Sequence, residues 1–169
     1  MTTFNISDTA LCSCGSNIQF KQCCKPLIEG TAAALSPEQL MRSRYTAFAL
    51  KCYDYIKQTH KSALSPITTA AELAKEFEGI YWCHLNVLSH SKTDDIGEVK
   101  FQAFYAANRK LYVLEETSCF VRENAVWLYD ADASKSEITK LKISRNDNCF
   151  CGSGKKYKKC CDSRIARAT

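Results

Sequence analysis

Two clusters of four cysteines constrain the fold of this chain more than any other feature. They hold eight of its 11 cysteines, and both read Cys-x-Cys, eight further residues, then Cys-Cys. The clusters comprise Cys12, Cys14, Cys23 and Cys24, and Cys149, Cys151, Cys160 and Cys161. Matching residues surround them, namely Gly15 and Gly152, Ser16 and Ser153, Phe20 and Tyr157, and Lys21 and Lys158. Asn17 stands where the second copy has Gly154, and because both residue types tolerate a left-handed backbone, we expect one turn in both copies.

Four thiolates in a short loop are typical of a tetrahedral metal site, and zinc is the usual occupant. We expect two zinc ions per chain, each in a closed and therefore structural site. A 13-residue loop has almost no core of its own, so the metal would order it, at about 10–16 kcal/mol per site in zinc-finger peptides. Two alternatives stay open: disulfides, and a redox-sensing zinc chaperone whose thiolates release the ion on oxidation.

The N-terminal residues 1–11 contain neither a basic region nor an apolar stretch, so they do not read as a signal peptide. No apolar run approaches the roughly 18 residues of a membrane span. We therefore expect a cytoplasmic protein whose thiols stay reduced, which argues against the disulfides.

The C-terminal cluster closely resembles the SEC-C motif, the zinc-binding tail of the export ATPase SecA. The resemblance rests on residues 145–161, which read RNDNCFCGSGKKYKKCC. It implies zinc ligation by Cys149, Cys151, Cys160 and Cys161, although SecA commonly has His at the last position. The first cluster resembles a more divergent copy. We expect an N-terminal module at residues 8–29 and a C-terminal module at residues 145–166, on either side of a central domain at residues 30–140.

The central domain divides into helical and then strand-like segments. Helices are expected over residues 36–51, 53–60 and 69–77, with a break at 62–66; Ser36 before Pro37 marks the first helix start. Strands are expected over residues 80–88, 99–105 and 111–121, with a short last one at 125–129 and turns at 94–97 and 108–110. Helices followed by antiparallel strands indicate an α+β fold.

This segment resembles the middle of the YchJ-like family of bacterial proteins. The resemblance rests on LMRSRYTAFA at residues 40–49, on FVRE at 120–123 and on WLY at 127–129. It implies a nuclear-transport-factor-2-like (cystatin-like) cone of three helices on a curved antiparallel sheet. Cones of this type often dimerise through the open sheet face, so a homodimer stays open.

The mouth of such a cone could hold a small molecule. The polar residues that could point there are Arg42, Arg44, His60, Glu116 and Arg122. We favour surface or rim ion pairs for them, because a fold does not imply a function. The sequence contains no recognisable nucleophile motif, so it does not favour an enzyme and assigns no catalytic residue.

The positive charge of the chain is local. Residues 142–169 carry a net charge of +6, whereas the whole chain carries +5. We therefore expect a partner-binding surface formed by Lys155, Lys156, Lys158, Lys159, Arg164 and Arg167. The SEC-C resemblance implies an acidic export chaperone, a ribosome or an anionic lipid surface. The favoured function is a zinc-stabilised binding or adaptor protein, and the main alternative is a small-molecule-binding protein or enzyme that uses the cone pocket.

Overall fold

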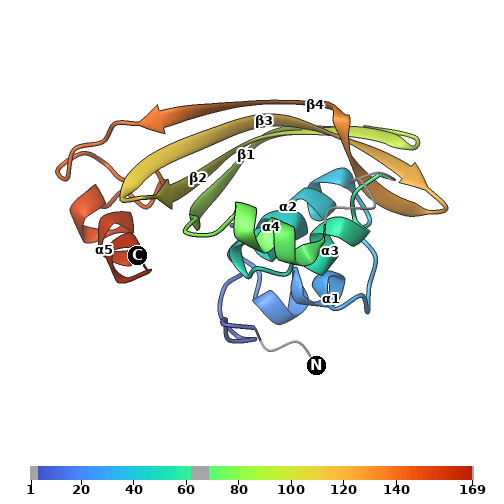
Figure 1. Ribbon diagram of the computed structural model, residues 1–169, viewed down its shortest axis with the longest axis horizontal. Helices are drawn as coiled ribbons and strands as arrows, with labels where there is room; N and C mark the ends of the chain where they lie inside the picture. Colours follow the sequence, from blue (N-terminus) through green and yellow to red (C-terminus); the bar gives the residue numbers. More distant parts are fainter. Residues whose placement is uncertain (1–3, 62–68, 169) are drawn as a thin grey trace.

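The computed structural model describes residues 4–61 and 69–168. Its centre is a four-stranded antiparallel sheet in the order β1-β2-β3-β4, in which each strand pairs with its sequence neighbours. The strands are β1 (Tyr81–Thr93), β2 (Ile96–Ala107), β3 (Lys110–Glu123) and β4 (Val126–Leu141). Figure 1 shows that the sheet is long and curved.

Alternation of side chains produces this sheet. In β2, Val99, Phe101, Ala103 and Tyr105 are buried, whereas Lys100 is exposed and Gln102 is half-buried. The predicted strands are confirmed, but two of them are longer than expected. The first was expected to end at residue 88 and instead continues to Thr93. β4 is not short: it continues to Leu141, which pairs with Leu111 at the start of β3. The predicted turn at 94–97 is shorter, because Ile96 and Gly97 already belong to β2.

Three helices form a layer under the sheet, and their ends carry the expected capping residues. They are α2 (Pro37–Ala49), α3 (Tyr53–Gln58) and α4 (Ala70–Glu76). The hydroxyl of Ser36 accepts a hydrogen bond from the Gln39 amide at 3.1 Å. Thr69 and Glu72 form a reciprocal capping box at the start of α4. The predicted break at residues 62–66 lies outside the described residues.

The helices cover one face of the sheet at one end only (Figure 1). The side chains of Leu40, Met41 and Tyr45 from α2 are buried in the main core. The other end of the sheet carries the C-terminal module and α5 (Cys161–Ala168). This arrangement confirms the predicted α+β fold of three helices on a curved antiparallel sheet. Among the described residues, no helix is both long and apolar enough to cross a membrane.

Candidate metal centres and a polar pocket

Both cysteine clusters are built from the same local structure. In each, a left-handed glycine follows the Cys-x-Cys pair, and its amide donates to the carbonyl of the first cysteine at 3.2 Å in both copies. A 3-10 helix (η1, Phe20–Gln22; η2, Tyr157–Lys159) then presents the Cys-Cys pair. Asn17 and Gly154 have φ angles of 60° and 70°. The predicted common turn is therefore confirmed, and with it the structural duplication.

The four sulfurs of each cluster converge on one point. In the first cluster, Sγ of Cys23 lies 3.6 Å from that of Cys14 and 3.8 Å from that of Cys24. In the second, Sγ of Cys151 lies 3.5 Å from those of both Cys149 and Cys160. Four sulfurs at about 2.3 Å from one ion lie about 3.8 Å from each other. The clusters therefore have the dimensions of a tetrahedral metal site, and all 11 cysteines are free rather than disulfide-bonded.

The electrostatics of the first cluster favour a bound cation. Hydrogen bonds from Cys12 and Cys24 lower the pKa of the Cys14 thiol to about 4. Hydrogen bonds to Cys12, Cys14 and Cys23 raise the pKa of the Cys24 thiol, because the proton of Cys24 is shared with these sulfurs. Protein groups alone therefore keep part of the cluster protonated, whereas a divalent cation would stabilise four thiolates at once.

Serine hydroxyls form hydrogen bonds with the sulfurs in both copies. The hydroxyls of Ser16 and Ser153 lie 3.1 Å and 3.3 Å from the Sγ atoms of Cys23 and Cys160. The sequence repeat contains both serines, and the structure shows why they recur. Groups of this kind orient metal ligands and adjust their charge.

The two clusters differ in how they join the domain. Cys12, Cys14 and Cys24 belong to the main hydrophobic core, together with Phe20 and Leu27. The Cys14 carbonyl also accepts a hydrogen bond from Nη1 of Arg42 at 2.7 Å. The second cluster instead forms a small core of its own against the end of the sheet, with Ala106, Tyr157 and Ile165.

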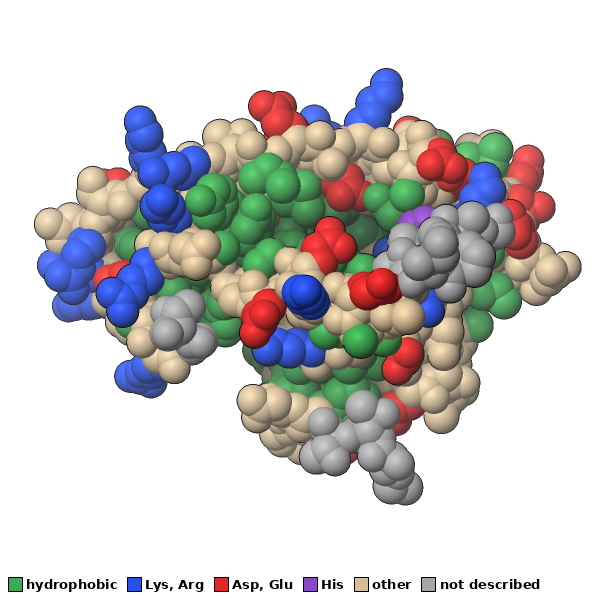
Figure 2. All heavy atoms as spheres, viewed as in Figure 1, with side chains coloured by type: hydrophobic (Ala, Val, Ile, Leu, Met, Phe, Trp, Pro, Cys, Tyr) green, Lys and Arg blue, Asp and Glu red, His purple; other side chains and the backbone are tan. Residues whose placement is uncertain are grey.

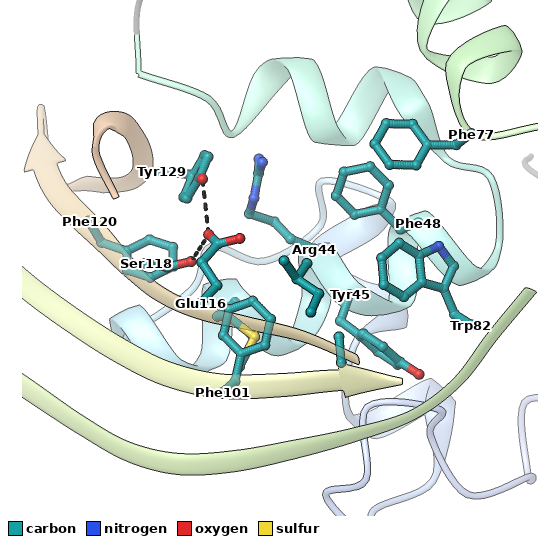
Figure 3. Close-up of a pocket in the computed structure, with 13 residues that line it drawn as sticks. Arg44, Tyr45, Phe48, Phe77, Trp82, Phe101, Glu116, Ser118, Phe120 and Tyr129 are labelled. Atoms are coloured by element: carbon teal, nitrogen blue, oxygen red, sulfur yellow. Dashed lines mark hydrogen bonds between the residues drawn. The ribbon is translucent and has the colours of Figure 1, made fainter. Parts of the chain in front are cut away.

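A cavity of about 240 Å³ lies between α2 and the concave face of the sheet. Aromatic side chains form most of its wall, and β3 contributes Glu116 and Ser118 (Figure 3). One carboxylate oxygen, Oε1 of Glu116, accepts hydrogen bonds from the Ser118 hydroxyl and, at 3.0 Å, from the Tyr129 hydroxyl. Arg44 lies at the same cavity with its guanidinium carbon 4.6 Å from the centre of the Tyr129 ring. The cavity is thus apolar with one group of hydrogen-bonded polar side chains.

Burial changes the ionisation of this polar group. It lowers the pKa of Arg44 to about 10. It also raises the pKa of Tyr129 to about 12, and the negative charge of Glu116 adds to that effect. Near neutral pH, Arg44 is therefore charged and Tyr129 keeps its proton for the hydrogen bond to Glu116.

Only some of the residues expected at the pocket line it. Arg44 and Glu116 do, whereas three others lie elsewhere. Arg42 pairs with Glu38 at 2.8 Å and holds the first cysteine cluster. His60 donates from Nδ1 to the carbonyl of the following lysine at 3.0 Å. Arg122 is exposed. Its one side-chain hydrogen bond to a described residue runs from Nε to the carbonyl of Ala125, at 3.4 Å.

The aromatic wall and the two hydroxyl groups of the pocket were not expected from the sequence. A usable signal existed, because Leu114, Glu116, Ser118 and Phe120 alternate along β3 and must therefore share one face. Tyr129 lies opposite Phe120 on β4. Its approach to Glu116 depends on strand register, which the sequence pattern did not specify.

The basic residues of the C-terminal module divide into two groups. Lys155, Lys156, Lys159 and Arg167 are exposed, and Lys158 is half-buried. Arg164 instead donates from Nη2 to Sγ of Cys161 at 2.8 Å. It therefore belongs to the surroundings of the second cysteine cluster more than to a free surface.

Comparisons with known proteins agree with this architecture. Residues 36–132 match the family model described as YchJ, middle NTF2-like domain, and residues 145–161 match the SEC-C motif. A SEC-C motif-containing protein from Rhodopseudomonas palustris, solved in solution, is 32% identical, with a TM-score of 0.68 over 76% of this chain and 98% of that one. The crystal structure of a SEC-C motif-containing protein from Psychrobacter arcticus has the same fold at 24% identity, with a TM-score of 0.65 over 95% of this chain and 98% of that one.

Proposed function

This chain belongs to the YchJ family with an NTF2-like middle domain and a SEC-C motif, and we propose that it is a zinc-stabilised binding protein. In this proposal, both cysteine clusters hold structural zinc. The C-terminal module and the adjoining end of the sheet contact an acidic surface of a partner protein. The observation that carries the proposal is the concentration of unpaired positive charge on that end.

Zinc fits the clusters because all four ligands of each are thiolates, which select soft ions such as zinc. A closed set of four leaves no position for a substrate, so the ion would serve folding rather than catalysis. Thiolate ligands also change the charge balance. With eight thiolates and two zinc ions, the chain would carry about +1, and residues 142–169 about +4.

The structure enlarges the basic surface beyond the C-terminal module. A groove beside Tyr157 is lined by Arg109 and Lys110 at the β2–β3 turn and by Lys140 and Lys142 near the end of β4. We call the full set the basic end; it comprises Arg109, Lys110, Lys140, Lys142, Lys155, Lys156, Lys158, Lys159 and Arg167. Figure 2 shows Lys and Arg side chains gathered at this end of the molecule. None of them forms an ion pair with a described residue, so their charge is available to a partner.

The surroundings of these charges favour a protein over RNA or lipid. Single-stranded nucleic acid is usually bound on exposed aromatic side chains, but Tyr157 is buried and Phe150 stacks on Phe104 at 4.8 Å. Membrane-surface helices insert an apolar face, but Ile165 of α5 is buried against the module. The basic end therefore offers lysine charges without exposed aromatic rings or an exposed apolar helix face. Such lysines can bind the carboxylates of an acidic protein surface.

The proposal is tested by capture from native lysate with a variant in which Lys155, Lys156, Lys158 and Lys159 are replaced by Glu. The native protein should retain protein partners at low salt, release them at high salt, and keep them after treatment with nuclease or detergent. The variant should lose them.

A matched control replaces the exposed lysines Lys21, Lys51, Lys75 and Lys135 by Glu, which gives the same total charge. It should keep the partners. Equal loss in both variants would show that only net charge matters. Loss on nuclease treatment would identify RNA as the partner, and loss on detergent treatment would identify lipid.

A further inference from the structure

The cavity between α2 and the sheet contains a carboxylate with unused hydrogen-bonding capacity. Oε1 of Glu116 accepts two hydrogen bonds, from the hydroxyls of Ser118 and Tyr129. Among the described residues, no group donates to Oε2, which points toward the space between Arg44 and the aromatic wall (Figure 3). Glu116 is half-buried and Oε2 remains accessible, so it can accept a hydrogen bond from solvent or from a molecule that enters the cavity. A ligand with an N–H or O–H group would supply the missing hydrogen bond.

The charge of the cavity is already balanced. Burial lowers the pKa of Arg44, and the nearby Tyr129, Tyr55 and Glu116 partly offset this effect, so the guanidinium keeps its charge near neutral pH. The guanidinium forms no direct ion pair with Glu116; its Nη1 donates to the Ile56 carbonyl at 2.9 Å and to the Thr59 hydroxyl at 2.7 Å. One positive and one negative group leave no net charge for an ionised ligand to compensate, so a neutral ligand is favoured.

The wall of the cavity is suited to a flat ring. Phe48 lies 4.8 Å from Phe77 and 5.9 Å from Trp82 between ring centres. Phe101 and Phe120 face them from the sheet (Figure 3). Aromatic rings pack on one another in offset or edge-to-face geometry at such distances. A volume of about 240 Å³ exceeds the roughly 150 Å³ cavity that binds benzene, so there is room for a bicyclic ring.

We propose that this cavity binds a neutral, planar aromatic molecule through an N–H or O–H group that donates to Oε2 of Glu116. This goes beyond the proposed role of the basic end and does not depend on it, because the two sites share no residue. Ser118 and Tyr129 would act as positioning residues: by occupying Oε1, they fix the carboxylate so that Oε2 faces the ring.

A matched pair of probes tests the hydrogen bond. Indole carries a ring N–H, and 1-methylindole has the same ring system without it. Calorimetry with the zinc-loaded full chain should show indole binding and roughly ten- to hundredfold weaker binding of 1-methylindole, as expected for a hydrogen bond to a charged group. Failure of both probes to bind at millimolar concentration would overturn the proposal, as would equal affinity for both.

Two neighbouring glutamates provide matched variants. Glu116→Gln should bring the affinities for the two probes within about threefold of each other, because an amide N–H replaces an acceptor. Glu115→Gln should preserve the preference, since Glu115 instead pairs with Lys100 at 3.0 Å. If Glu116→Gln does not fold, the probe pair on the native protein still decides the question. Tighter binding of benzylammonium than of indole would instead identify a cation site.

Discussion

The two cysteine clusters are coupled to the domain to different degrees, and one replacement in each tests this. Cys14 and Cys151 hold equivalent positions in the duplicated motif, so Cys14→Ser and Cys151→Ser remove the same ligand from each site. Cys14 is 0% exposed within the main core, whereas Cys151 is half-buried in the separate small core. We expect Cys14→Ser to destabilise the whole domain and Cys151→Ser to destabilise mainly its own module.

The size of the difference follows from what each module buries. Without its metal, the N-terminal module would release Phe20 and Leu27, which are 0% and 4% exposed. Returning each to water costs about 1.5–3 kcal/mol, and loss of the Arg42 bond to the Cys14 carbonyl adds about 1 kcal/mol. The sum of about 4–7 kcal/mol is a large part of the about 5–15 kcal/mol that stabilises a typical protein. The corresponding side chains of the C-terminal module, Tyr157 and Ile165, are 7% and 8% exposed but belong to the separate small core, so their release leaves the main core intact. Among the buried residues of that small core, only Ala106 belongs to the sheet, so the main domain should lose about 1 kcal/mol.

Thermal unfolding followed by circular dichroism, in reductant and with zinc, measures both effects. At about 2–4 °C per kcal/mol for a chain of this size, Cys14→Ser should lower the melting temperature by at least about 8 °C and Cys151→Ser by at most about 4 °C. Equal shifts, or a larger shift for Cys151→Ser, would refute the claim that only the N-terminal site supports the main core.

Three further predictions concern the packing, the pH dependence and the C-terminal metal site. Gly97→Ala should destabilise the protein by about 1–3 kcal/mol in urea unfolding, because its Cβ would overlap the first residue of α2; an unchanged midpoint would contradict this packing. The bond of Lys61 to Asp130 at 2.6 Å raises the pKa of the lysine above 10.5, so its stabilisation is present below that pH and lost as the pH rises through the folded-state pKa. The pair also needs ionised Asp130, whose pKa the lysine lowers, so the stability difference between the protein and Lys61→Gln should be constant from about pH 5 to about pH 10 and vanish above that range; a difference that grows above about pH 10 would argue against the pair. Arg164→Gln should weaken metal binding at the C-terminal site by roughly 10–100-fold in chelator competition, because it removes the N–H donor to Cys161, while the N-terminal site keeps its affinity; equal weakening at both sites would show a general effect instead.

The sequence predicted the metal clusters because all their determinants are local. Four ligands, a left-handed turn and a short 3-10 helix lie within 13 residues, so spacing alone brings the sulfurs together. Alternation in β2 likewise predicted a strand and its buried face. Features that depend on only a few consecutive residues were thus recovered correctly.

The features that were missed depend on pairing between distant segments. The second half of β4 carries mostly exposed side chains and lacks apolar alternation, so its length became visible only through its pairing with β3. The contact of Tyr129 with Glu116 also depends on that register. Arg164 looked like one more surface cation, although the first turn of α5 directs it toward Cys161.

The central claim, that eight cysteines hold two zinc ions, is tested most directly by metal analysis combined with thiol titration of the native chain. We predict two zinc ions per chain and three titratable thiols, those of Cys52, Cys83 and Cys119. Cys83 should react slowly, because burial raises its pKa to about 12. Unfolding in chelator should then release both ions and expose all 11 thiols. Fewer than two zinc ions, or fewer than 11 thiols after unfolding, would contradict the account.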